Sequence, residues 1–60
     1  MIYLIDPQSD LQIARFEQIT YGLLAGRLMA IELKKPLELR EGEARELVAT
    51  FSEHGQAMLE

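Results

Sequence analysis

One stretch of the sequence, Ile19–Leu33, contains only two charged residues, Arg27 and Glu32. Within and just before it, apolar or small residues recur at intervals of three or four positions: Phe16, Ile19, Leu23, Gly26, Ala30 and Leu33. This is the spacing of residues that share one face of an α-helix. The stretch therefore predicts a helix with an apolar face that packs against another element.

A second apolar line has the same spacing on the neighbouring face and consists of Tyr21, Leu24, Leu28 and Ile31. The apolar arc is therefore wider than that of an ordinary surface helix, and such a helix needs more than one partner. The small residues Gly22, Gly26 and Ala30 would allow another backbone to approach closely. The apolar run contains Arg27 and is shorter than the roughly 20 residues of a membrane span. We therefore expect no membrane insertion.

The chain has 60 residues and includes no cysteine and one histidine. A domain of this size buries only about 60 % of the surface that its unfolded chain exposes. Small domains are commonly secured by disulfides, a metal or self-association. A chain without cysteine cannot form a disulfide, and a single histidine cannot build a structural metal site within one chain. The sequence therefore predicts self-association, in agreement with its 48 % hydrophobic content.

The order of the signals predicts one domain, residues 1–60, in four parts. Residues 1–6 read as a short strand or extended arm, because Met1–Ile5 is β-branched, aromatic and aliphatic. Residues 7–35 read as a first helix, which Asp6 and Pro7 would begin and Pro36 would end. Residues 36–40 form a connector, and the triplet Leu37–Leu39 is the only other strand candidate. Residues 41–59 read as a second helix, with Ala44, Leu47, Val48, Phe51 and Met58 at helical spacing.

These parts predict a mainly α fold, a helical hairpin with a short N-terminal strand or arm. Two copies would associate as a homodimer and form a four-helix bundle. The oligomer interface would consist of Phe16, Ile19, Leu23, Gly26, Ala30, Leu33, Leu47, Val48 and Phe51.

The formal charge of −4 is concentrated in residues 41–60. An acidic chain lacks the attraction to phosphate on which nucleic-acid binding depends, so nucleic acid is disfavoured as a partner. We expect a larger protein partner, as yet unidentified, to be contacted by the N-terminal arm and the acidic second helix. The arm could add a strand to the edge of a partner's sheet. The partner-binding residues would be Ile2, Tyr3, Leu4, Ile5, Glu43 and Glu46.

No residue pattern indicates catalysis, a cofactor or a metal. His54 is the only imidazole and has no nucleophile or orienting carboxylate at a suitable spacing. The carboxylates show no metal-ligand spacing, and Gly22 and Gly26 lie inside an apolar helix pattern instead of a phosphate-binding loop. The sequence therefore predicts a protein that is not an enzyme.

Taken together, these features predict a small, acidic, cytoplasmic interaction protein of the phage or plasmid type. It would oligomerise and bind, sequester or inhibit a larger protein, or act as an adaptor. One alternative is a DNA-binding regulator, because a strand followed by two helices is the outline of ribbon-helix-helix repressors. The other alternative is an oligomeric enzyme in which symmetry brings His54 or paired carboxylates together at an interface.

Overall fold

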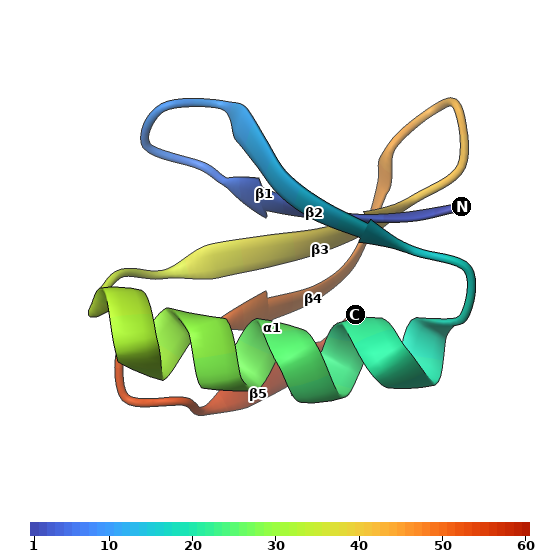
Figure 1. The fold of residues 1–60 in the computed structure, drawn as a ribbon. Helices are drawn as coiled ribbons and strands as arrows, with labels where there is room; N and C mark the ends of the chain where they lie inside the picture. Colours follow the sequence, from blue (N-terminus) through green and yellow to red (C-terminus); the bar gives the residue numbers. More distant parts are fainter.

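The computed structural model describes residues 1–60 and shows an antiparallel five-stranded sheet with one helix packed on one face (Figure 1). The spatial order of the strands is β2-β1-β3-β4-β5. In chain order the elements are β1 (Ile2–Asp6), β2 (Leu11–Phe16), α1 (Ile19–Leu33), β3 (Leu37–Glu41), β4 (Glu46–Phe51) and β5 (Ala57–Leu59). The predicted mainly α hairpin, and with it the four-helix bundle, is therefore wrong.

The N-terminal segment is a central strand. β1 pairs with β2 on one side and β3 on the other, so that Leu4 lies opposite both Ala14 and Leu39. Asp6 and Pro7 open a turn, in which Asp10 has φ 58°, and the chain returns as β2. The predicted helix over 7–35 is thus limited to Ile19–Leu33, the part with the continuous apolar pattern.

The predicted second helix over 41–59 is wrong because its backbone turns twice. Gly42 (φ 75°) and Arg45 (φ 52°) are left-handed and make the turn between β3 and β4. Gly55 (φ 88°) lies in the turn between β4 and β5. The spacing of Leu47, Val48 and Phe51 fits a helix, but β4 is half-buried and contains the β-branched Val48 and Thr50, which favour strands.

The core lies between α1 and the sheet. The sheet supplies most of it, and its largest fully buried side chains are Leu4, Leu37, Leu39 and Phe51. The helix contributes Ala30 as its only buried side chain, with Gly22 and Gly26 also buried. Small residues therefore face the sheet and let the helix approach it closely.

The helix ends where the basic residues begin. Lys34 adopts the left-handed conformation (φ 57°), and its backbone N–H donates to the carbonyls of Ala30 and Ile31. This is the usual way to close a helix, although glycine is the residue that most often occupies the position. The one helix of the structure does not combine the length and the apolarity that crossing a membrane requires.

A partly buried ion pair joins the end of β1 to the segment after α1. Asp6 is only 5 % exposed, and its carboxylate accepts hydrogen bonds from Lys35 Nζ (3.1 Å) and the backbone N–H of Gln8 (3.0 Å). The hydrogen bond from Lys35, followed by that from Gln8, lowers the pKa of Asp6 below its ordinary value of 3.8. The pair fixes the first hairpin against the start of β3.

Candidate interaction surface

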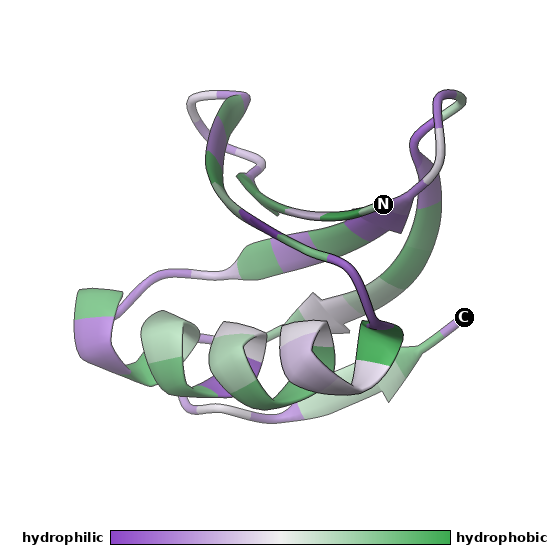
Figure 2. Ribbon diagram, turned by 45° about the vertical axis from the view of Figure 1, so that its right-hand side comes forward, coloured by the Kyte–Doolittle hydropathy of each residue, from purple (hydrophilic) through white to green (hydrophobic).

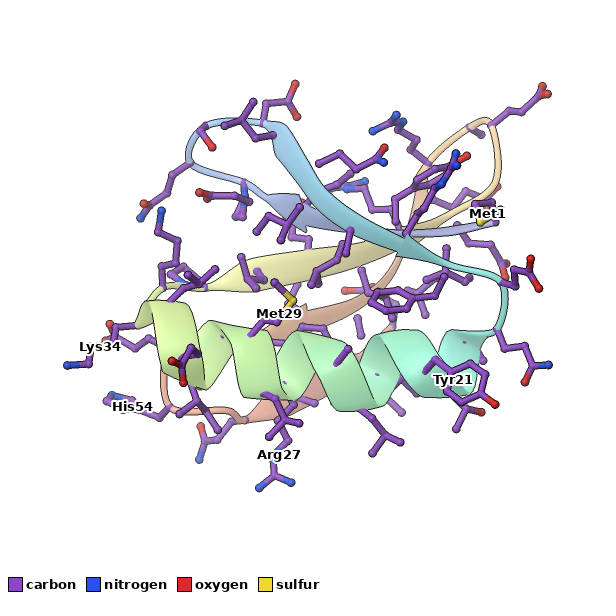
Figure 3. The ribbon with its side chains drawn as sticks, in the orientation of Figure 1. Met1, Tyr21, Arg27, Met29, Lys34 and His54 are labelled. Carbon is purple, nitrogen blue, oxygen red and sulfur yellow. The ribbon has the colours of Figure 1, made fainter.

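The side of α1 that faces away from the sheet is apolar. Tyr21, Leu24, Leu28 and Ile31 are 59 %, 63 %, 66 % and 43 % exposed. We call these four residues the outer helix face. They lie on the opposite side of the helix from Gly22, Gly26 and Ala30, which contact the sheet. In Figure 3, Tyr21 and Arg27 project away from the sheet, whereas Met29 is directed toward the core.

The outer helix face is unusual for a surface helix, which normally turns charged and polar residues to water. Figure 2 shows that apolar colouring continues around much of α1, whereas hydrophilic residues gather in the loops. Single exposed apolar residues are ordinary, but a contiguous apolar patch usually marks an interaction site. The four residues are contiguous because they follow one another at intervals of three or four along one helix.

A second apolar feature lies beside the helix. β5 is the last strand of the sheet and pairs only with β4. Its residues Met58 and Leu59 are 72 % and 69 % exposed. The turn before β5 is in contact with α1, because a Cβ on Gly55 would lie 2.6 Å from Ile31 Cδ1. β5 then runs alongside the helix, as Figures 1 and 2 both show.

The face of the sheet opposite α1 is polar. Tyr3 lies between Arg15 on β2 and Arg40 on β3, and the Arg45 guanidinium stands over its ring, 4.8 Å from the centroid. Arg40 is paired with Glu38 at 3.0 Å. An open hollow of about 740 Å³ on this face is lined by Ile5, Pro7, Asp10, Glu38, Arg40, Ala44 and Arg45. Its two acidic and two basic residues balance, so the hollow has no net charge with which to select a charged ligand.

The titratable groups do not assemble a reactive centre. His54 Nε2 lies 3.6 Å from Glu53 Oε1, and both side chains are mostly exposed. The turn brings these neighbours together, whereas a helix would have separated them. No group of three or more His, Cys, Asp or Glu residues is placed to hold a metal ion. Every buried side-chain nitrogen or oxygen has a hydrogen-bond partner within the chain, so no unpaired buried polar atom indicates a ligand site.

The predicted interface residues lie on both sides of the helix–sheet contact. Gly26, Ala30 and Phe51 are buried inside the chain. Phe16, Leu23, Leu47 and Val48 are partly buried, and all of these except Leu47 pack against the core. Ile19 and Leu33 are exposed at the two ends of α1. Most residues of the predicted oligomer interface therefore pack between α1 and the sheet of the same chain.

The predicted partner-binding residues are similarly divided. Ile2, Leu4 and Ile5 are buried in β1, and Tyr3 is partly buried. Because β1 is hydrogen-bonded on both edges, it has no free edge for a partner's strand. Glu43 and Glu46 are exposed at the turn between β3 and β4.

The exposed surface was visible in the sequence only as a second apolar line. Tyr21, Leu24, Leu28 and Ile31 have the spacing of a helix face, but spacing alone does not say which face packs inside the chain. The small residues Gly22, Gly26 and Ala30 indicate a line that can approach another backbone closely, but the structure is needed to show that this backbone is the chain's own sheet. Met58 was expected in a second helix, and the exposure of Met58 and Leu59 follows instead from their place on the edge strand β5.

The chain was compared with family models, curated proteins and solved structures, and none of them matches it.

Proposed function

We propose that this protein is a small protein–protein interaction module that self-associates through the outer helix face and binds a larger protein. The observation that carries the proposal is the exposure of Tyr21, Leu24, Leu28 and Ile31 on the side of α1 opposite the core. Placing these side chains in water is unfavourable, by about 25 cal/mol for each Å² of apolar surface. A second copy that covers them would recover this free energy.

The size of the chain supports self-association. Its whole accessible surface is 4241 Å². The core cluster contains seven buried residues, and α1 contributes only one of them, Ala30. Covering the other side of the helix would give this small core a second layer. A cytoplasmic location remains part of the proposal and can be checked by cell fractionation.

The test compares two substitutions of the same kind. Leu28 on α1 is 66 % exposed, and Leu11 on β2 is 65 % exposed but lies away from the outer helix face. The chain, Leu28→Asp and Leu11→Asp are each measured by light scattering over a dilution series, with circular dichroism on the same samples. We expect a mass that is a multiple of 6.8 kDa for the chain and for Leu11→Asp, and a fall toward 6.8 kDa for Leu28→Asp alone.

Two results would contradict the proposal. One is a folded monomer at every concentration, and the other is an oligomer that Leu28→Asp leaves unchanged. The partner-binding part is tested in the same way, by asking whether a protein captured by the immobilised chain is lost with Leu28→Asp and kept with Leu11→Asp.

A further inference from the structure

We propose that two copies of this chain pair through β5, antiparallel about a two-fold axis at Met58, so that their sheets join into one sheet of ten strands. This inference rests on the self-association in the proposed function and specifies its geometry. It follows from the backbone of β5, its residues and its place beside α1.

The hydrogen bonds at the ends of β5 show which of its backbone groups are free. The N–H of Glu60 donates to the carbonyl of Val48 (3.0 Å), and the N–H of Ser52 donates to the carbonyl of Gln56 (2.8 Å). Backbone groups of successive residues in an antiparallel strand point to alternate sides. The groups of residues 56, 58 and 60 therefore point toward β4, and those of Ala57 and Leu59 point away from the sheet.

The free groups are self-complementary. When a second β5 is placed antiparallel with Met58 opposite Met58 of the second copy, Ala57 lies opposite Leu59 of that copy, and Leu59 opposite Ala57. Each of these two pairs can exchange two backbone hydrogen bonds, since all four residues point their N–H and C=O groups into the gap. Every free backbone group of the strand is satisfied by this one register.

The side chains fit the same register. Leu59 lies opposite Ala49, a buried residue on the helix side of the sheet, so Leu59 faces that side and Met58 faces the other. Leu59 of each copy would thus stand beside the small Ala57 of the other. The two Met58 side chains would meet across the axis on the opposite face. A large residue next to a small one, repeated twice by symmetry, allows close packing.

The other edge of the sheet carries a charge and a bulge, whereas the only protection of β5 is its length of three residues. Strand edges are usually blunted by a very short edge strand, charge, proline or a bulge, because unpaired edges associate. β2 carries Arg15, and its pairing with β1 is interrupted by a register shift at Leu4/Ile5. β5 contains no charged residue and no proline, and it pairs with β4 without a shift. Of the two edge strands, β5 is therefore the one whose free backbone groups are shielded by neither charge, proline nor a bulge.

A three-residue strand is too small to hold a dimer alone, but its neighbour extends the contact. β5 runs along α1, and the turn that leads into it touches Ile31. Ile31, Met58 and Leu59 are 43 %, 72 % and 69 % exposed, so exposed apolar side chains adjoin the free edge on both faces of the sheet. A second copy is the occupant that fits this edge, because its own β5 presents the same free groups in the opposite direction.

The first experiment uses the fact that the chain has no cysteine. In a pair of residues that do not exchange hydrogen bonds, the Cα atoms are about 4.5 Å apart, within the range that a disulfide spans. Met58→Cys is therefore expected to give a disulfide-linked dimer on mild oxidation at low protein concentration, seen on a non-reducing gel. The matched control is Leu11→Cys, which is equally exposed on the opposite edge and should stay largely uncrosslinked.

A second variant removes one of the free donors without touching the pairing inside the chain. The N–H of Ala57 points away from β4, and proline is tolerated at the first residue of a strand. We expect Ala57→Pro to keep the circular dichroism spectrum and to lower the mass by light scattering. In the unsubstituted chain, the amides of Ala57 and Leu59 should become protected from hydrogen exchange as concentration rises.

The outcomes separate this inference from the proposed function. Crosslinking at Met58→Cys and loss of mass with Ala57→Pro support the pairing of β5. A dimer that is sensitive to Leu28→Asp but shows no more crosslinking at Met58→Cys than at Leu11→Cys overturns the β5 pairing and leaves the proposed function standing. A monomer at all concentrations overturns both.

Discussion

Gly26 on α1 lies directly against the ring of Phe51 on β4. A Cβ on this glycine would stand 2.5 Å from Phe51 Cε2 and 2.8 Å from Phe51 Cζ. Contacts this short between carbon atoms are strongly repulsive, so only glycine allows the helix to sit at this height above the sheet. The relationship sets how close α1 lies to the core and therefore which of its sides remains exposed.

Replacing Gly26 with alanine is expected to destabilise the fold, although alanine is the better helix former. Overpacking a core costs about 1–3 kcal/mol, and the gain in helix propensity is about 1 kcal/mol. The ring of Phe51 cannot move aside without leaving its own buried position. We expect a net loss of about 1 kcal/mol in the free energy of unfolding, measured by urea denaturation.

Gly22→Ala is the matched control. A Cβ on Gly22 would lie 2.9 Å from Leu39 Cδ1, the end of a flexible side chain, and 3.0 Å from Ile2 Cγ2. These contacts are longer than the 2.5 Å at Phe51 and the Leu39 methyl can shift, so the gain in helix propensity should offset most of the cost. If Gly26→Ala is as stable as Gly22→Ala, the close contact between Gly26 and Phe51 is not what sets the helix position.

The ion pair between Asp6 and Lys35 predicts a loss of stability in acid. Because the pKa of Asp6 is lower in the folded chain than its ordinary value of 3.8, the folded state favours the ionised carboxylate. This contribution is fully present above the unfolded-state pKa and is lost as the pH falls through the lower folded-state pKa. Urea denaturation at pH 7, 5 and 3 should show the decline between pH 5 and 3.

The Asp6→Asn variant isolates this effect. It keeps an oxygen that can accept from the backbone N–H of Gln8 but carries no charge for Lys35. We expect it to be less stable than the unsubstituted chain at pH 7 and to approach it at pH 3. Asp10→Asn, in the same turn, is the control and should leave the pH dependence attributed to Asp6 in place.

Lys34 occupies a backbone position better suited to glycine. Its φ of 57° is left-handed, which costs a residue with a Cβ roughly 1–2 kcal/mol. Its side chain is exposed and forms no ion pair. Lys34→Gly should therefore raise the free energy of unfolding by about 0.5–1 kcal/mol, after allowing for the greater freedom of glycine in the unfolded chain. A loss of stability, measured by thermal or urea denaturation, would contradict this.

Local signals identified only part of the fold. The Ile19–Leu33 pattern corresponds to α1 over the same residues, because an apolar repeat sustained over four turns is hard to satisfy in a strand. The segments Met1–Ile5 and Leu37–Leu39 were strand candidates for the same reason that they form strands, their β-branched and alternating residues. The helices expected over 7–35 and 41–59 were wrong where the chain forms β2 and β4, because a short run of apolar residues fits the period of a helix or of a strand.

The sequence by itself determined the central helix, its two apolar lines and the small residues that allow close packing. Only the tertiary structure decided that the line with Gly22, Gly26 and Ala30 packs on the chain's own sheet and that the line with Leu24 and Leu28 faces outward. The physical reason is that strand pairing joins segments far apart in the sequence: β1 meets β3, and β4 brings Phe51 under Gly26. Local spacing records which residues share a face, and long-range pairing decides what that face meets.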